Sequence, residues 1–285
     1  MKLGLSSYSL VRAIKSQQLD ILGAIDWIAD NGGEHVEIVP IGFNLTENPE
    51  LIDAIRDKAA AVGIDISNYA IGANFITDTR EQYENEIERV KREVDIAHRL
   101  GVKRMRHDVA SRKDTSMLRF QEDLELLASA CRQIADYAAQ FDIVTSVENH
   151  GYYIQASDRV QALIHAVDRP NFRTTLDVGN FMCADENSVA AVKKNIAYAS
   201  MVHVKDFYLR PAALNPGTGW FPTASGNHLR GAIVGHGDID MRQVISIIKH
   251  SGYDGYISVE FEGMEDCFTG SKLGLETVRR LWDEV

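Results

Sequence analysis

Short runs of β-branched and other apolar residues alternate along the chain with longer stretches in which apolar residues recur every three or four positions. The short runs predict eight β-strands, at residues 2–6, 35–39, 65–71, 104–109, 145–149, 173–178, 200–206 and 256–261. The stretches between them predict helices, most clearly at residues 19–32, 49–63, 80–101 and 120–141. Eight strand–helix units predict an α/β fold, a (β/α)8 TIM barrel that forms a single domain over residues 1–285.

A doubly wound open sheet would produce similar local patterns and is the alternative fold. Such sheets usually have fewer units and carry a glycine-rich turn after the first strand. Here the first strand is followed by SYSLVRA, which contains no GxGxxG motif. The length of 285 residues, 45% of them hydrophobic, also suits one large barrel. The barrel is therefore the leading prediction.

The charge of the chain argues against nucleic acid as a partner. Acidic residues outnumber basic residues by 41 to 30, and no run of Lys and Arg is longer than two. Binding to a phosphate backbone needs clustered positive charge. The three cysteines, Cys131, Cys183 and Cys267, have no zinc-type spacing, and no apolar stretch approaches about 20 residues. We expect reduced thiols, a cytoplasmic location and no membrane span.

Polar side chains stand at the ends of four consecutive predicted strands. Glu148 ends the fifth strand, Asp177 the sixth, and His203 and Glu260 lie near the ends of the seventh and eighth. The C-terminal ends of the strands form the catalytic face of such a barrel, so these side chains should meet at its mouth. Carboxylates that are forced together repel unless a cation lies between them. The donor set predicts one divalent metal ion per chain, with Mn²⁺ expected first and Mg²⁺, Co²⁺ or Zn²⁺ also compatible.

A single carboxylate at a strand end is more often a solvated loop residue, and a single histidine is more often a hydrogen-bonded core residue. The common register of four such residues is what favours a site. Residues two apart on a strand face the same way, so each predicted ligand has a neighbour higher in the mouth, near the substrate. The pairs are Glu148 with His150, His203 with Lys205, and Glu260 with Glu262. For Lys205 an ion pair with Asp206 or Glu262 is the alternative.

The motifs SVENH, LDVGN, VHVKD and VEFEG, in this order, resemble those of the sugar isomerase and epimerase branch of the xylose-isomerase-like TIM barrels. That family also contains inosose dehydratase, hydroxypyruvate isomerase and, more distantly, endonuclease IV. The resemblance covers the whole chain and includes GHGDID, which is similar to the family's G-x-G-x-I-D turn. It implies that Glu148, Asp177, His203 and Glu260 hold the metal. It also implies that the two glutamates transfer a proton at a carbon beside a carbonyl.

Several positions depart from the family pattern or leave a role open. Asn180 stands where several relatives have a histidine, and an amide can bind a substrate hydroxyl but is a poor metal ligand and base. Residues 229–231 lack the Asp-x-His pair of the endonuclease branch, so a three-metal cluster is not expected. His107, at the end of the fourth strand, either contacts substrate or metal or caps the barrel mouth. Because a ligated carboxylate is a weaker base, His150 and Lys205 remain alternative proton carriers.

A long loop is predicted at residues 207–240, directly after the seventh strand. Long loops on the catalytic face of a barrel are often lids. Trp220 and Phe221 would then cover the substrate, and Arg210 or Arg230 would bind a polar or anionic group on it. A subunit contact in a homo-oligomer is the alternative. The sequence leaves open whether the substrate is phosphorylated.

The leading functional hypothesis is an isomerase or epimerase of a small sugar or polyol-derived ketone, acting by proton transfer through a metal-stabilised enediolate. A dehydratase of an inosose- or dehydroshikimate-like ketone would use the same metal site, since an enediolate can expel a β-hydroxyl. A sugar-binding barrel without turnover is a third hypothesis, against which the complete ligand set argues. Products separate the first two, because only the dehydratase forms an enone.

Overall fold

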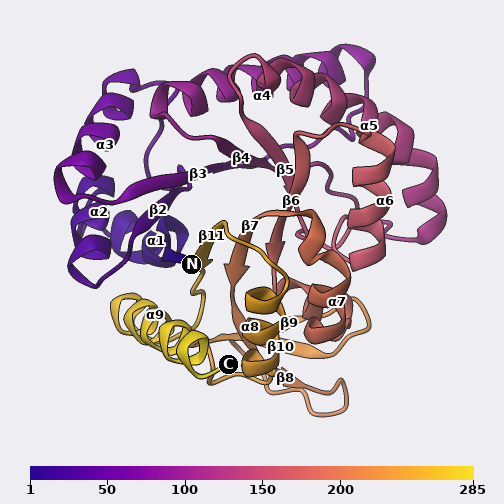
Figure 1. Cartoon of the computed structure of the whole chain (residues 1–285). Coiled ribbons are helices and arrows are strands. Elements are labelled where there is room, and N and C mark those ends of the chain that lie inside the picture. The colour runs from indigo at the N-terminus through magenta and orange to yellow at the C-terminus, as the bar shows by residue number, and fades with distance from the viewer.

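The computed structural model describes residues 1–285 and shows a closed barrel of eight parallel strands surrounded by helices (Figure 1). Around the barrel the strands follow the order β1-β11-β7-β6-β5-β4-β3-β2. Their bounds are β1 (Lys2–Ser6), β2 (His35–Ile38), β3 (Asp65–Ile71), β4 (Arg104–His107), β5 (Val144–Glu148), β6 (Phe172–Asp177), β7 (Ala199–Val204) and β11 (Tyr256–Val259). The predicted barrel is confirmed, and β1 and β3 have the predicted bounds.

The helices run between successive strands and form the outer ring (Figure 1). They are α1 (Val11–Lys15), α2 (Ile21–Asp30), α3 (Pro49–Val62), α4 (Arg80–Leu100), α5 (Met117–Ala139), α6 (Ser157–Val167), α7 (Ser188–Asn195), α8 (Met241–His250) and α9 (Cys267–Glu284). Short 3-10 turns are η1 (Ser7–Leu10), η2 (Asn180–Ala184) and η3 (Ile196–Tyr198). Gly63 and Gly101 end α3 and α4 with φ angles of 76° and 80°, a left-handed conformation that favours glycine. No helix combines the length and the apolar character needed to cross a membrane.

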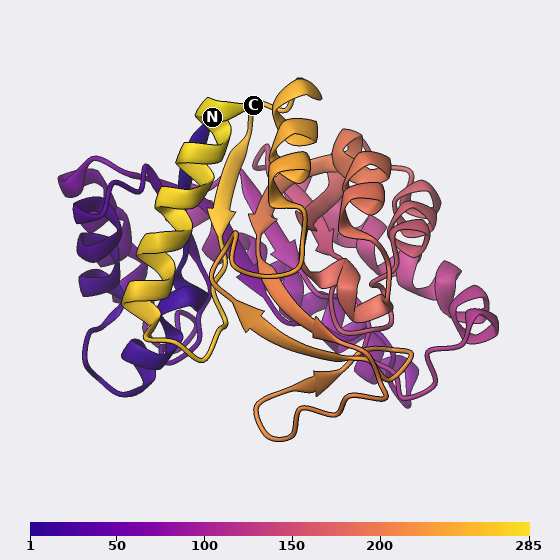
Figure 2. The same ribbon diagram turned by 90° about the horizontal axis from the view of Figure 1, so that it is seen from below.

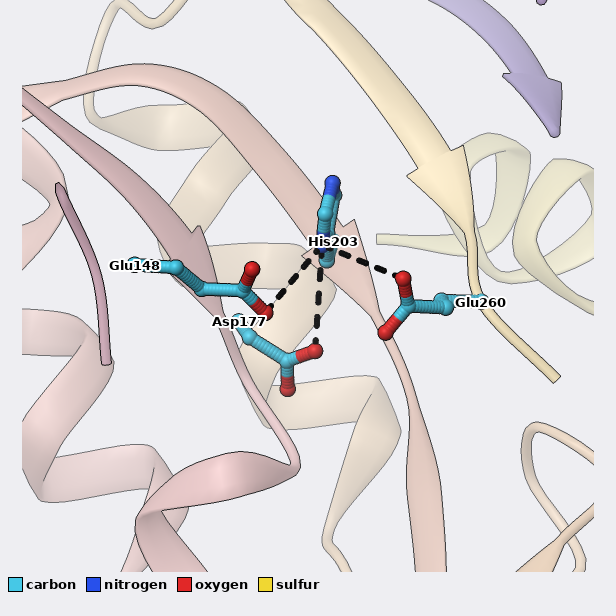
Figure 3. A group of neighbouring side chains, drawn as sticks. All are labelled: Glu148, Asp177, His203 and Glu260. Atoms are coloured by element: carbon cyan, nitrogen blue, oxygen red, sulfur yellow. Dashed lines mark ion pairs between the residues drawn. The ribbon is translucent and has the colours of Figure 1, made fainter. Parts of the chain in front are cut away.

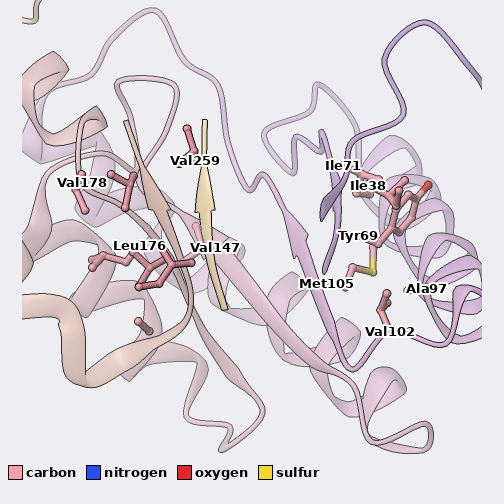
Figure 4. Packing of buried hydrophobic residues seen from close by; sticks show 14 of the residues in the cluster. Ile38, Tyr69, Ile71, Ala97, Val102, Met105, Val147, Leu176, Val178 and Val259 are labelled. Carbon is pink, nitrogen blue, oxygen red and sulfur yellow. The ribbon is translucent and has the colours of Figure 1, made fainter. Parts of the chain in front are cut away.

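One cluster of 69 buried apolar residues joins the strands to the helices and forms the core of the barrel (Figure 4). Val147, Leu176 and Val259 belong to this cluster and lie at or near the ends of β5, β6 and β11. Each is followed directly by a carboxylate. Because neighbouring residues on a strand face opposite sides, packing of the apolar residue into the core directs the next side chain into the barrel.

The segment at residues 207–240 differs from the irregular loop that the sequence predicts. It contains a three-stranded antiparallel sheet of β8 (Asp206–Arg210), β9 (Phe221–Pro222) and β10 (His228–Ala232). In Figure 2 this orange sheet projects from the end of the barrel opposite to the two termini. Phe207 and Leu229 of this sheet pack with Cys183 in a small, separate apolar cluster. Strands of two and five residues, separated by Pro- and Gly-rich turns, are too short to give a clear periodic signal.

Asp206 connects this sheet to the GHGDID turn that precedes α8. Its carboxylate accepts hydrogen bonds from the backbone N–H groups of Phe207, Gly235, Gly237 and Ile239, at 2.9, 2.8, 3.0 and 3.4 Å. A Cβ atom at position 237 would lie 2.2 Å from Oδ1 of Asp206. The final Asp of VHVKD and the G-x-G-x-I-D turn are therefore two halves of one structural unit.

Asp206→Ala should lower the free energy of unfolding by about 3 kcal/mol, because it leaves several buried N–H groups without an acceptor. Urea unfolding followed by circular dichroism measures the change. Asp206→Asn, which keeps one acceptor oxygen, is the matched control and should lose less. An alanine variant within about 0.5 kcal/mol of the wild type would contradict this role.

Candidate metal centre

Four ionisable side chains from adjacent strands converge inside the C-terminal end of the barrel (Figure 3). Glu148 and Asp177 are the last residues of β5 and β6, His203 lies in β7, and Glu260 directly follows β11. These strands are neighbours in the order β11-β7-β6-β5, and Asp177 pairs with His203 in the β6–β7 register. The structure thus brings together the four residues that the sequence analysis selects.

The ligand atoms of the four residues all lie within 4.8 Å of one another, and all four side chains are buried. From Nδ1 of His203 the distances are 3.5 Å to Glu148 Oε1, 3.9 Å to Asp177 Oδ2 and 3.8 Å to Glu260 Oε1. Two donors bound to one ion at about 2.1 Å would lie about 3 to 4 Å apart. The spacing of the cluster therefore suits a shared cation.

The turn after β6 fixes the orientation of Asp177. Its Oδ1 accepts hydrogen bonds from the backbone N–H groups of Gly179 and Asn180, both at 2.8 Å, which leaves Oδ2 for the cluster. A Cβ atom at position 179 would lie 2.9 Å from the Lys205 carbonyl oxygen, so glycine permits this close approach. The Asn149 amide donates to the Asp177 carbonyl at 2.8 Å and accepts from its N–H at 2.9 Å. Asn149 thus bonds to the barrel wall.

Two ligand atoms of the cluster are buried without a hydrogen-bond partner, Asp177 Oδ2 and His203 Nδ1. Burial, together with the charges of Glu148 and Glu260, raises the pKa of Asp177 to about 6 despite the opposing effect of Lys205. Burial acts to lower the pKa of His203, but Glu37, Glu260 and Glu148 hold it well above its usual value. The shift of the His203 pKa reflects the negative charge that surrounds this imidazole.

Glu37, in the middle of β2, orients the imidazole and was missed from the sequence. Its Oε1 lies 2.9 Å from His203 Nε2 and accepts a 2.7 Å hydrogen bond from the Asn68 side chain. Since a carboxylate accepts, Nε2 carries the proton and Nδ1 faces the cluster. This is the carboxylate–histidine arrangement that fixes the tautomer of a metal ligand. The available signal was a carboxylate between two buried apolar residues of one predicted strand.

Glu37→Gln should weaken metal affinity by about 10- to 100-fold, because the amide no longer holds His203 in the ligating tautomer. Competition with a chelating dye measures the dissociation constant. Asn68→Ala loosens Glu37 without touching His203 and should produce a smaller loss in the same direction. Wild-type affinity in Glu37→Gln would show that the pair does not act on the metal site.

Arg106, on β4, is a second residue that the sequence analysis did not select. Its guanidinium forms an ion pair with Glu148 and donates from Nε to Glu148 Oε2 at 2.6 Å. Burial acts to raise the pKa of Glu148, but Arg106 and His203 hold it well below its usual value. Asp108 lies 3.5 Å from Arg106 Nη1 and 3.4 Å from His150 Nδ1. Arg106 therefore stabilises the ionised form of Glu148.

Lys205 and Asn180 lie beside the cluster, as the strand alternation predicts for Lys205. Lys205 Nζ is 2.6 Å from Glu260 Oε2, 3.3 Å from Asp177 Oδ2 and 3.5 Å from Glu262 Oε2. It also donates to Asn180 Oδ1 at 3.3 Å, and the Asn180 amide donates to Glu148 Oε1 at 3.1 Å. The ion pair with Glu262, the alternative for Lys205, is thus present together with contacts to the cluster.

Three further candidate residues do not line the cavity above the cluster, namely His107, Trp220 and Arg210. His107 is fully buried in the barrel wall, where its ring packs edge-on against Phe75 and burial lowers its pKa to about 4. Trp220 lies on the three-stranded sheet, 5.5 Å from the Arg210 guanidinium and 5.2 Å from that of Arg230. Neither His107 nor Trp220 nor the two arginines contribute to the lining of the cavity. A lid role for Trp220 stays a prediction.

A cavity of about 500 Å³ opens above the cluster. One wall is the segment after β2, in which Ile41, Phe43 and Leu45 present apolar side chains. The lining also includes charged groups, among them Asp108 and Glu262. A cavity of this size and mixed polarity suits a small-molecule ligand with both hydroxyl groups and C–H faces.

The donor set fits a divalent cation. Three carboxylates and one imidazole suit a hard or borderline ion, and the cluster offers two unpartnered donor atoms. Without a metal ion, the charge of the three buried carboxylates is offset only by neighbouring side chains, namely His203, Lys205 and Arg106. The buried cluster can therefore hold one metal ion.

The sequence matches the model of the family described as xylose isomerase-like TIM barrel over residues 25–282. The chain belongs to the xylose isomerase-like TIM barrel family. The match spans most of the barrel and includes all four residues of the cluster. A comparison with curated protein sequences gave no match.

Solved structures with the same fold include the IolI protein with a bound zinc atom, with a TM-score of 0.79 and 15% identity over 100% of this chain and 99% of that one. The probable 3-DHS dehydratase AsbF of Bacillus anthracis gives 0.76 and 16% over 98% and 99%. D-Psicose 3-epimerase of Clostridium cellulolyticum H10, solved with D-tagatose, gives 0.75 and 16% over 99% of both chains. At these identities the similarities show a shared fold.

Proposed function

We propose that the protein is a divalent-metal-dependent isomerase or epimerase of a small sugar or ketose. The observation that carries this proposal is the buried cluster of three carboxylates and one imidazole at the floor of a 500 Å³ cavity. Membership of the xylose isomerase-like family and the likeness to D-psicose 3-epimerase support it. The reaction would remove a proton from a carbon beside a carbonyl and return it through an enediolate.

Glu148, Asp177, His203 and Glu260 would hold the ion, with Mn²⁺ as the expected metal. A bound divalent cation would supply the positive charge that stabilises the oxygens of the enediolate. Asp177 and His203 are suited to holding it, because each is fixed by hydrogen bonds on its other polar atom. The imidazole would bind through Nδ1, the atom that faces the carboxylates.

Glu148 and Glu260 would carry the proton between them. The two carboxylates come from opposite ends of the four-strand arc, so they would flank a substrate carbon from different sides. Their surroundings differ, since Glu148 is held by Arg106 whereas Glu260 is paired with Lys205. Different partners for two proton carriers are what a reaction with distinct acid and base roles requires. His150 and Lys205, which line the cavity, would bind the substrate hydroxyl groups. Asn180 does not line the cavity and would act through its hydrogen bonds to Lys205 and Glu148.

A dehydratase is the second candidate, and one observation favours it. His150 lines the cavity beside Asp108, 3.4 Å away. Burial acts to lower its pKa, but Asp108 and Glu148 raise it above its ordinary value, which favours the protonated form of His150. A proton delivered to a β-hydroxyl would let water leave from the same enediolate.

Incubation of the Mn²⁺-loaded protein with ketoses and keto-polyols in deuterated water tests the proposal. An isomerase or epimerase should place deuterium on carbon and preserve the molecular formula of the product, as read by NMR and mass spectrometry. A dehydratase would instead lose water and develop an enone absorbance. Carbon-bound protons that exchange no faster than with metal-free protein would contradict both candidates.

A further inference from the structure

The cavity is more acidic than a metal site requires. Six carboxylates face it or form its floor, against three Lys or Arg side chains and the ionisable His150. The carboxylates are Glu93, Asp108, Glu148, Asp177, Glu260 and Glu262, and the Lys and Arg side chains are Arg89, Arg106 and Lys205. With His150 protonated, a divalent ion would bring the summed charge of these groups to zero, and with His150 neutral it would leave one negative charge. In either form the loaded site carries no excess positive charge to attract an anion.

Each of the three cations is already engaged by acidic neighbours. Arg89 donates to Glu86 from Nε at 2.8 Å and lies 3.5 Å from Glu93. Arg106 is paired with Glu148 and Asp108.

Lys205 is similarly engaged, by Asp177, Glu260 and Glu262. A phosphate or carboxylate group of a substrate is normally bound by Arg or Lys side chains that are free to pair with it. His150, which can also carry positive charge in the cavity, lies 3.4 Å from the Asp108 carboxylate. Every group that could pair with an anion is therefore already engaged by an acidic neighbour.

Of the acids outside the metal cluster, Asp108 and Glu262 are the two paired with proposed substrate-binding residues, His150 and Lys205. Asp108 and Glu262 keep 26% and 25% of their side-chain surface exposed, whereas the four cluster side chains keep at most 8%. Their oxygens can accept hydrogen bonds from hydroxyl groups but would repel an anion. Phe43 also lines the cavity and adds an aromatic side chain suited to the C–H side of a sugar.

We propose that Asp108 and Glu262 make the site selective for an uncharged polyhydroxylated ketone, and that they exclude substrates carrying a phosphate or carboxylate group. This inference rests on the proposed function and narrows it. It separates an inosose-like ketone, which is neutral, from a dehydroshikimate-like ketone, which carries a carboxylate.

Matched neutral and charged compounds test the inference with the Mn²⁺-loaded protein. The pairs are D-fructose with D-fructose 6-phosphate, and a neutral inosose with 3-dehydroshikimate. In deuterated water the neutral member should exchange its carbon-bound proton at least about 10-fold faster. Faster exchange of the charged members would overturn the inference and leave the proposed function intact.

Calorimetric titration of the same compounds makes the test independent of turnover. Tighter binding of the charged members overturns the inference even if no proton exchanges. Tighter binding of the neutral members without exchange upholds the inference and contradicts the proposed catalysis.

Inorganic phosphate probes the two acids directly. Asp108→Asn and Glu262→Gln should each tighten phosphate binding by about 10-fold, because each removes one negative charge next to a cation in the cavity. Glu125→Gln removes the same charge from the exposed outer side of α5 and should change nothing. Unchanged phosphate affinity in both cavity variants would overturn the inference.

Discussion

Glu148→Gln should slow the exchange of the substrate's carbon-bound proton by about 10,000-fold, and the variant should also lose most of the bound metal. The substitution removes a ligand charge and a proposed proton carrier in one step. It also leaves the buried Arg106 guanidinium without the carboxylate that it contacts through Nε at 2.6 Å. Asp108, 3.5 Å from Arg106 Nη1, would then be the only acidic partner of this largely buried charge, which further disfavours the folded site.

Metal content and exchange rate are measured on the same preparation, with circular dichroism to confirm folding. Glu93→Gln is the matched control, because Glu93 lines the same cavity but lies outside the metal cluster. It should keep the metal. A Glu148→Gln protein that retains both full metal content and wild-type exchange would remove Glu148 from the proposed mechanism.

His150→Ala should keep the metal and lose substrate binding or rate by about 10- to 1000-fold. The side chain lines the cavity two residues beyond Glu148 and is half exposed, at 50%. Its ionic partner is Asp108 rather than any residue of the cluster. Loss of one oriented hydrogen bond or proton donor therefore changes the reaction without opening the metal site.

The comparison with Glu148→Gln separates the proposed roles of the two residues in the SVENH motif, Glu148 as a metal ligand and His150 as a substrate-binding residue. Metal analysis beside deuterium exchange distinguishes a ligand from a substrate-binding residue. His165→Ala, on the outer helix α6, is the control for loss of a histidine side chain. If His150→Ala loses its metal as fully as Glu148→Gln, His150 is a ligand and its assignment is wrong.

The barrel and its metal cluster could be predicted because they depend on local patterns. Val147 and Leu176 mark the side of the strand that packs in the core, and each is followed by a carboxylate at a strand end. Carboxylates at the ends of successive strands are expected to lie together, since the parallel strands of a barrel share one C-terminal face. The four-residue convergence follows from this register alone.

Glu37 and Arg106 were missed because their roles depend on contacts far apart in the sequence. Glu37 bonds to a histidine 166 residues away, and Arg106 bonds to a carboxylate 42 residues away. Both lie within strands rather than at the polar ends that attract notice. The sheet of β8, β9 and β10 was missed for a different reason, because its strands are short and its core contains only three buried residues.

Metal analysis of the purified protein tests the central claim most directly. The wild type, Asp177→Asn and His203→Ala are each saturated with Mn²⁺, passed through a desalting column and measured by mass spectrometry. The account predicts about one ion per chain in the wild type. It predicts a large loss in both variants, because each substitution removes one of the four proposed metal ligands. Undiminished metal in both variants would contradict the site.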